Sequence, residues 1–326
     1  MPLDPRVKRF LDALAAGSPP NVLETTVEER RRGLAELMKF SGPEVTVGRI
    51  EDRFLPRAGG LPAAEPPAAE PPAAGPLAVR IYTPLDSSVA LMPGLVYFHG
   101  GGLVAGSLDT HDAIARALAN SAQCRTVSVE YRLAPEHPFP AALEDALAAV
   151  TYISAHAGEF GIDGSRLGIC GDSAGATLAA VTAQAIARIG KPRLALQVLI
   201  CPILDYSRST PSKRELASGY LVDQATLDHD LLYYAPPGAD PADPRISPLR
   251  APDLAGLPRT LIHTAEFDPL RDEGRDYFER LERAHAEVSY TCHPGMIHLF
   301  YGLGAVIPYA RTAIDAIGGE IRAALA

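Results

Sequence analysis

The chain has 326 residues, and its 30 Lys and Arg against 39 Asp and Glu give a formal net charge of −9. Such an acidic balance argues against binding to a phosphate backbone, so no nucleic-acid partner is expected. Hydrophobic residues make up 47% of the chain and charged residues 21%, which excludes disorder as a description of the whole chain and is typical of a globular protein with a large core.

No stretch approaches the roughly 20 apolar residues that a bilayer-spanning helix needs. The first six residues also lack the basic and then apolar pattern of a signal peptide. We therefore expect a cytoplasmic protein without a membrane anchor. The four cysteines lie far apart without a CxxC pair, so neither a metal site nor a disulfide framework is expected.

Two amphipathic helices are predicted in the first 40 residues, because apolar residues recur there at the spacing of one helical face. Thr25 and Glu28 have the spacing of a capping box, which predicts the start of the second helix. The two apolar faces consist of Val7, Phe10, Leu11 and Leu14, and of Val27, Leu34, Leu37 and Met38.

Two strand-like segments follow, at 45–55 and 77–82, and a Pro/Ala stretch separates them. In this stretch the sequence AAEPP occurs at 63–67 and again at 68–72. Its prolines lack an N–H donor and fix φ, so it cannot form a helix or a strand ladder. We interpret it as an extended surface linker.

From residue 95 onward, short apolar segments alternate with helix-length amphipathic ones, which predicts a mostly parallel sheet flanked by helices and hence the α/β class. The predicted strands are 95–99, 126–131, 166–171, 195–201, 260–266 and 288–293. The predicted helices lie near 111–121, 140–157, 174–188, 270–285 and 305–325.

The interval 205–250 breaks this alternation, because it is longer and richer in Pro, Asp and Tyr. An insertion after the carboxyl end of a strand lies where α/β sheets place their active sites. We therefore predict that 205–235 and the N-terminal helices form a cap over the site. Its apolar residues are expected to line a modest pocket, and they are Leu216, Tyr220, Leu221, Leu227, Leu231 and Leu232.

The segment around Ser173 is a GxSxG motif between a strand and an Ala-rich helix. A serine on such a sharp turn is exposed above the sheet, and the flanking Gly171 and Gly175 allow the backbone to pass closely. Taken alone, the motif fits either a nucleophile or a structural turn.

Upstream, HGGG at 99–102 ends another apolar strand. Successive glycines can turn backbone N–H groups toward a substrate oxygen, as an oxyanion hole requires. A flexible turn and a phosphate-binding loop are the alternatives, but no GxGxxG or GK[ST] pattern accompanies these glycines. His99 and Gly100 are expected to shape this loop.

A serine nucleophile needs a base, and the base needs a carboxylate that orients it. Asp268 and His298 each follow a predicted strand, so both are expected at the same sheet edge as Ser173. Of the competing acids, Asp272 and Glu273 are expected on a solvated or capping helix face, and Glu266 within the strand. His263 and His293 are expected to be structural, and low priority is given to His111, His156, His229 and His285.

Together these blocks resemble the hormone-sensitive lipase family of α/β-hydrolases, also called bacterial family IV esterases. The resemblance covers about residues 95–300 and includes YRLAPEHPFPAALED at 131–145, read as scaffold, and DPLRDEG at 268–274. It implies an α/β-hydrolase fold with a helical cap, no cofactor and a possible homodimer. It also implies a triad of Ser173, Asp268 and His298, and an oxyanion hole formed by the amides of Gly101, Gly102 and Ala174.

The expected function is therefore that of a serine carboxylesterase that hydrolyses small esters with short to medium acyl chains. The expected division is an N-terminal cap segment at 1–44, a core at 45–204, a cap insertion at 205–235 and a second core part at 236–326. Two alternatives remain: a non-catalytic small-ligand-binding protein on the same scaffold, and an acyltransferase or amidase that uses the same triad.

Overall fold

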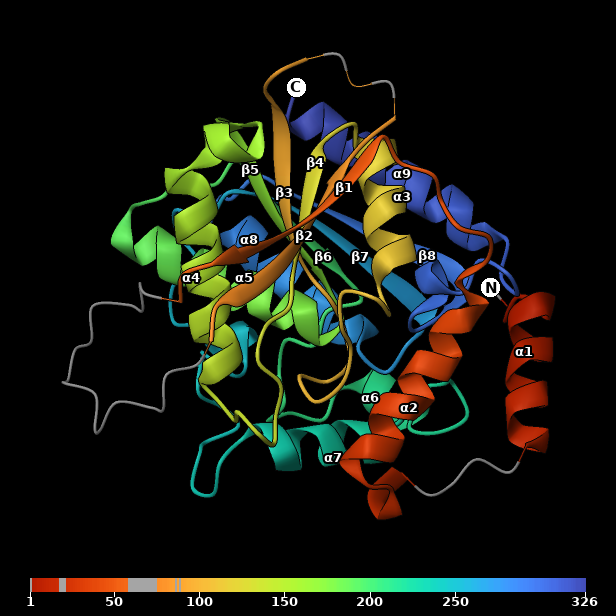
Figure 1. The fold of residues 1–326 in the computed structure, drawn as a ribbon. Helices are drawn as coiled ribbons and strands as arrows, with labels where there is room; N and C mark the ends of the chain where they lie inside the picture. The colour runs from red at the N-terminus through yellow and green to blue at the C-terminus, as the bar shows by residue number, and fades with distance from the viewer. Residues whose placement is uncertain (1, 18–21, 58–74, 86, 88) are drawn as a thin grey trace.

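The computed structural model describes residues 2–17, 22–57, 75–85, 87 and 89–326, which form an eight-stranded sheet between layers of helices (Figure 1). The strands are β1 (Arg49–Leu55), β2 (Leu77–Thr83), β3 (Met92–Phe98), β4 (Arg125–Val129), β5 (Ile162–Asp172), β6 (Leu196–Ile200), β7 (Arg259–Phe267) and β8 (Val288–Ile297). The α-helices are α1 (Pro5–Ala16), α2 (Val27–Met38), α3 (Asp112–Ala122), α4 (Ala141–Ala155), α5 (Ala174–Ile189), α6 (Pro211–Glu215), α7 (Gln224–Tyr234), α8 (Arg271–Arg283) and α9 (Tyr309–Ala324).

The sheet has the strand order β1-β2-β4-β3-β5-β6-β7-β8. β2 is antiparallel to both of its neighbours, β1 and β4. The other neighbouring pairs, which join β4, β3, β5, β6, β7 and β8 in that order, are all parallel. The predicted α/β class with a mostly parallel sheet is therefore confirmed. Within the described residues, no helix combines the length and apolarity needed to cross a bilayer.

The central strands β3, β4 and β6 are buried on both faces of the sheet, since alternate residues of a strand point to opposite sides, whereas the edge strand β1 is mostly exposed. In β3, Val96 and Phe98 belong to a core with α4, α5 and α8, whereas Leu95 and Tyr97 belong to a second core with α3 and α9. This double burial explains why these central strands appear in the sequence as continuous apolar segments.

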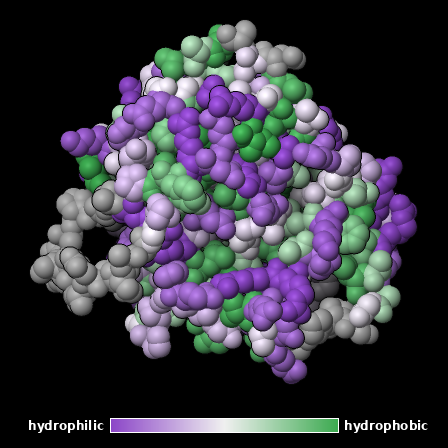
Figure 2. Space-filling view, in the orientation of Figure 1, coloured by the Kyte–Doolittle hydropathy of each residue, from purple (hydrophilic) through white to green (hydrophobic). Residues whose placement is uncertain are grey.

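Much of the molecular surface seen in Figure 2 is hydrophilic, and hydrophobic residues form smaller areas between the hydrophilic ones.

The predicted strands are present, but several bounds differ. β1 begins only at Arg49, and β5 begins at Ile162, where the pairing with β3 contains a register shift. β8 continues through Pro294 to Ile297, because a second register shift restores its pairing with β7 at Phe267. The AAEPP repeat lies outside the described residues.

The capping box of α2 differs from the prediction by one residue. Thr26, not Thr25, caps the helix: its side chain accepts from the Glu29 N–H, and the Glu29 carboxylate accepts from the Thr26 N–H. The hydroxyl of Thr25 instead donates to the Val22 carbonyl at 2.7 Å. The helix therefore starts at Val27, where the backbone leaves the extended conformation of Thr26.

Helices α2, α6 and α7 gather at one end of the molecule, although α2 is far from the other two in sequence (Figure 1). Arg31 ties α2 to the loops that follow β3 and β4. Its guanidinium donates to the carbonyls of Val104 (2.9 Å) and Ala134 (3.1 Å) and forms an ion pair with Glu136. The N-terminal segment is thus attached to the backbone next to the glycine-rich loop.

Candidate active site

Ser173 occupies the sharp turn between β5 and α5, with a φ of 53° that a non-glycine residue rarely adopts. The two glycines of the motif allow this turn. A Cβ on Gly175 would lie 2.1 Å from the Phe98 carbonyl oxygen, and one on Gly171 would lie 2.2 Å from the Gly175 oxygen. Both positions therefore exclude a side chain, which explains the spacing of the motif.

His298 lies between Ser173 and Asp268. Its Nε2 is 3.0 Å from the Ser173 Oγ, and its Nδ1 is 2.8 Å from the Asp268 Oδ2. Asp268 directly follows β7 and His298 directly follows β8, and all three side chains are buried. The parallel strands thus bring three residues that are distant in sequence to one edge of the sheet, as expected. The arrangement permits proton transfer from serine to imidazole.

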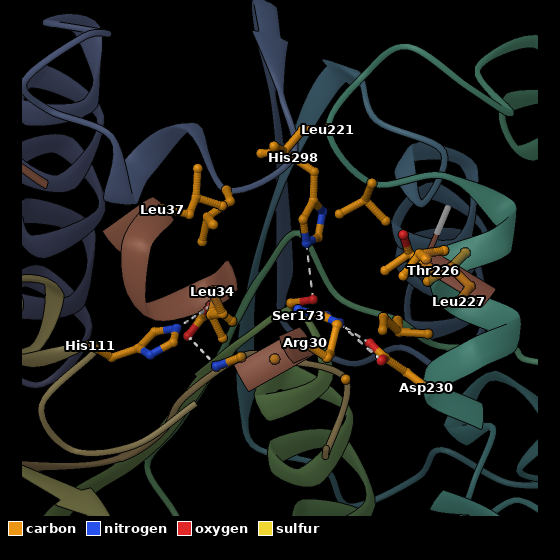
Figure 3. A pocket seen from close by; sticks show the side chains of 18 residues that line it. Arg30, Leu34, Leu37, His111, Ser173, Leu221, Thr226, Leu227, Asp230 and His298 are labelled. Carbon is orange, nitrogen blue, oxygen red and sulfur yellow. Dashed lines mark hydrogen bonds and ion pairs between the residues drawn. The ribbon is translucent and has the colours of Figure 1, made fainter. Parts of the chain in front are cut away.

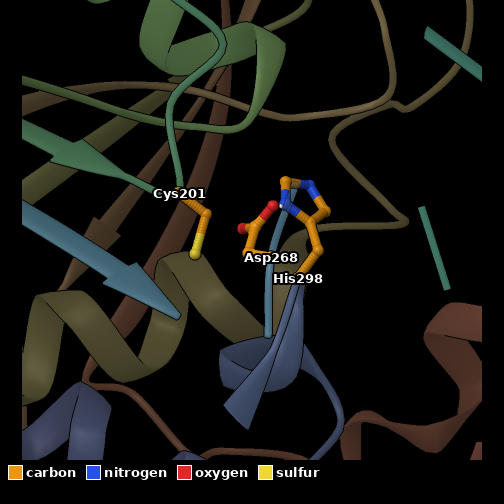
Figure 4. A group of neighbouring side chains, drawn as sticks. All are labelled: Cys201, Asp268 and His298. Atoms are coloured by element: carbon orange, nitrogen blue, oxygen red, sulfur yellow. Dashed lines mark hydrogen bonds and ion pairs between the residues drawn. The ribbon is translucent and has the colours of Figure 1, made fainter. Parts of the chain in front are cut away.

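Cys201 lies beside this pair, following β6 (Figure 4). One potential ligand atom from each of Cys201, Asp268 and His298 falls within 4.8 Å of the others. Both nitrogens of His298 are already engaged, one by the carboxylate and one by Ser173. Because neither nitrogen is left for a cation, the group is better described as an acid–base pair with a thiol alongside. Burial raises the pKa of the Cys201 thiol well above its usual value, which keeps it protonated.

The loop after β3 has the backbone that an oxyanion hole needs. Gly101 and Gly102 both have positive φ values, 121° and 70°, and the Gly101 carbonyl accepts from the Ala105 N–H at 2.9 Å. Within the part of the chain that the structure describes, the N–H groups of Gly101, Gly102 and Ala174 have no acceptor. Ala174 is the first residue of α5, where an N–H has no partner within the helix.

His99 holds the glycine-rich loop through contacts with Gly100 and Tyr131. Its Nδ1 lies 2.8 Å from the Gly100 carbonyl oxygen, and its ring stacks on Tyr131, whose hydroxyl donates to the His99 carbonyl. Burial and the neighbouring His111 lower the pKa of His99 to about 3, so the ring is neutral at ordinary pH. These contacts agree with a loop-shaping role.

The sequence reasoning missed Asp172, which holds this loop against β5. Its buried carboxylate accepts from the hydroxyls of Tyr97 (2.5 Å) and Tyr301 (3.0 Å) and from the Gly100 N–H (3.0 Å), and it lies 3.6 Å from the His111 Nε2. Burial alone would raise the pKa of Asp172, but His111 and the tyrosine hydroxyls outweigh it and lower that pKa. The only signal in the sequence was its place in GDSAG.

A small cavity of about 160 Å³ opens in front of Ser173 (Figure 3). Its apolar lining includes Leu34 and Leu37 of α2, Leu221 of the loop between α6 and α7, and Leu227 of α7. Of the six cap residues predicted to line it, only Leu221 and Leu227 do. Leu232 is 73% exposed, because five residues along α7 turn it to the other side of the helix from Leu227.

The expectation of a solvated or capping face for Asp272 and Glu273 is wrong. Glu273 is fully buried and accepts hydrogen bonds from the N–H groups of Leu204 and Asp205, and it forms an ion pair with Lys213. Asp272 accepts from the Ser212 N–H at 2.8 Å. These acids attach the start of the insertion to α8, so the missing signal was a partner from a distant segment.

His263 and His293 contact each other, with 3.3 Å between the His263 Nδ1 and the His293 Nε2. The Tyr309 hydroxyl lies 3.1 Å from the His293 Nδ1. Burial lowers the pKa of His263 to about 3 and that of His293 to about 4. Both residues lie in the interior, away from the cavity, as a structural role requires.

Residues 95–302 match the model of an alpha/beta hydrolase fold family. Carboxylesterase NlhH of Mycobacterium tuberculosis is 43% identical over 241 residues, which cover 73% of this chain and 75% of that protein. An arylesterase of Saccharolobus solfataricus is 35% identical and covers 93% of both chains. The solved structure of an ester hydrolase from the Lake Arreo metagenome, 36% identical, superposes with a TM-score of 0.91 over 98% of each chain. The chain therefore belongs to the α/β-hydrolase family, among the esterases of its hormone-sensitive lipase branch, bacterial family IV.

Proposed function

We propose that this chain is a serine carboxylesterase in which Ser173 is the nucleophile, His298 the general base and Asp268 the acid that orients the base. The observation that carries the proposal is the position of His298, within hydrogen-bond distance of both other residues. His298 Nε2 takes the Ser173 hydroxyl proton as the Oγ attacks the ester carbonyl. The same nitrogen then gives the proton to the departing alcohol, and the acyl group remains bound to Ser173 as an ester.

The second half of the cycle reverses these roles. Water attacks the acyl ester, His298 takes the proton of the water, and the Ser173 oxygen leaves with that proton as the carboxylic acid is released. The amides of Gly101, Gly102 and Ala174 bind the negative oxygen in both halves. Their lack of a partner among the described residues supports this role, because a preorganised donor needs no rearrangement during the reaction.

The cap in this proposal consists of segments 1–44 and 205–235, which rest on the core segments 45–204 and 236–326. Leucines from both cap segments line the cavity, which supports this division. Its volume of about 160 Å³ lies below the roughly 300–1,000 Å³ of pockets for drug-sized ligands. The preferred substrates are therefore small esters with short to medium acyl chains.

The test is the initial rate of hydrolysis of p-nitrophenyl esters from acetyl to palmitoyl, for the wild type and for Ser173→Ala. We expect a maximum at a short acyl chain, and a loss of at least about 10⁴-fold in the variant. Equal rates in both proteins would overturn the assignment of Ser173. If neither protein hydrolyses any ester while both bind one, the chain is a ligand-binding protein; transfer to added alcohols or amines would indicate an acyltransferase.

A cytoplasmic location and a homodimer, which the sequence and the family resemblance imply, belong to the same proposal. Cell fractionation and light scattering of the purified protein test them directly.

A further inference from the structure

An ion pair between the two cap segments lines the cavity. Arg30 of α2 binds Asp230 of α7 in a bidentate manner, with 3.2 Å from its Nε to the Oδ1 and 2.9 Å from its Nη2 to the Oδ2. The side chain of Asp230 is 5% exposed and that of Arg30 is 17% exposed. In the view of Figure 3 the guanidinium lies between Ser173 and the carboxylate.

The carboxylate of Asp230 lies directly on Gly102. A Cβ built on Gly102 would fall 1.8 Å from the Asp230 Oδ2, so the carboxylate occupies the space beside the Gly102 Cα. Gly102 is one of the residues whose amide is assigned to the oxyanion hole. A negative charge is therefore fixed next to the place where the substrate oxygen becomes negative, in a buried site where water and salt screen it poorly.

Two cationic or polar partners surround this carboxylate. The guanidinium of Arg30 covers both oxygens, and the Nδ1 of His229 lies 3.2 Å from the Oδ1. His229 is also held by the Thr25 carbonyl, and its hydrogen bond with Asp230 raises the pKa of His229. Of the two, the guanidinium engages both carboxylate oxygens, whereas His229 engages one.

We propose that Arg30 is a positioning residue that acts through its charge. It neutralises the Asp230 carboxylate, so that this carboxylate does not weaken the binding of the negative substrate oxygen by the amides of the oxyanion hole. This inference rests on the proposed esterase function. Arg30 does not touch the reacting atoms and acts through Asp230 and Gly102.

A purely mechanical role for Arg30 can be separated from this electrostatic one, because α2 has a second attachment. Independently of Arg30, the Arg31 side chain binds the Val104 and Ala134 carbonyls and Glu136. Loss of the Arg30 side chain therefore leaves α2 joined to the core. The variant should fold, with the Asp230 carboxylate beside Gly102 no longer paired with a guanidinium.

The experiment is a double-mutant cycle with p-nitrophenyl butyrate. Arg30→Met is expected to lower kcat about 10- to 100-fold with little change in KM, because the charge acts on the transition state more than on the neutral ester. Asp230→Asn leaves the positive charge of Arg30 beside Gly102 without a negative one, so its kcat should not fall as that of Arg30→Met does and should rise by up to about threefold. The double variant Arg30→Met/Asp230→Asn should recover most of the lost activity.

Matched controls and a second readout make the result specific. Arg32→Met, on the same helix with a side chain that is 63% exposed, should change nothing. A trifluoromethyl ketone, whose serine adduct carries the oxyanion, should bind Arg30→Met more weakly by about the same factor as kcat falls. Arg30→Lys should keep most of the activity and Arg30→Gln should lose it, which gives the same comparison if Arg30→Met does not fold.

The inference is overturned if the double variant is as slow as Arg30→Met, or if Asp230→Asn is as slow as Arg30→Met, because the pair then acts only as a tether. Failure of the esterase function itself would show separately, as a wild type without hydrolysis or as an unaffected Ser173→Ala.

Discussion

The edge of the sheet and the cap contribute to the site in different ways. Ser173, Asp268 and His298 follow β5, β7 and β8, and the parallel pairing of β5 through β6 and β7 to β8 holds the ends of these strands together. The cavity roof comes from α2 and α7, which are joined by the ion pair of Arg30 and Asp230. Backbone pairing therefore places the proposed triad, whereas side-chain contacts between α2 and α7 shape the cavity in front of it.

The strongest test of the sheet edge is Asp268→Asn. An asparagine keeps the shape but favours the wrong tautomer of His298, so kcat should fall about 10⁴-fold with an unchanged melting temperature. Steady-state rates with p-nitrophenyl acetate and circular dichroism measure both quantities. Full activity in a folded variant would mean that another carboxylate orients the base.

The junction between the two regions is tested by Glu273→Gln. This change leaves the buried ammonium of Lys213 without its counter-ion, which should cost about 3–5 kcal/mol of the free energy of unfolding. Urea unfolding measures the loss. Glu279→Gln, on the same helix but with a half-exposed side chain, is the control and should be nearly neutral. If both variants unfold alike, the buried pair does not hold the insertion.

The buried histidines of the core predict a loss of stability in acid. Burial lowers the pKa of His99 and His263 to about 3 and that of His293 to about 4, below the roughly 6.5 of an unfolded chain. The unfolded chain therefore binds more protons as the pH falls below about 6.5, and each histidine removes up to about 1.4 kcal/mol per pH unit. Urea unfolding at pH 7.5, 6.5 and 5.5 tests this; a constant free energy of unfolding over that range would contradict it.

The smallest expected effect concerns the cap and acyl-chain length. Leu37 and Leu221 line both the cavity and a neighbouring groove of about 560 Å³ between α1, α2 and the loop before α7. Leu37→Ala should open the cavity toward this groove and raise the rate with octanoyl relative to butyryl esters about 10-fold. Leu232→Ala, on the exposed side of α7, should leave the ratio unchanged. An unchanged ratio in Leu37→Ala would mean that Leu37 does not limit chain length.

Much of the sheet and of the candidate site follows from the sequence, because parallel strands must end at one edge and the motifs directly follow those strands. The partners of helices do not follow in the same way. The pattern of α2 shows which face is apolar, but not that Arg30 meets Asp230, 200 residues away. Glu273 looked exposed for the same reason. The sequence also left open which threonine is the N-cap residue of helix α2, because Thr25 and Thr26 both precede a glutamate by three residues.

The strand order also has a consequence for the time at which activity can arise during folding. Among the strands that the structure describes, β8 lies at the edge of the sheet and pairs with β7 alone, and His298 follows it near the end of the chain. Ser173 and the glycine-rich loop can take their places on β5 and β3 before that pairing exists, but the base cannot. Hydrolysis therefore cannot return on refolding before the eighth strand has paired with β7.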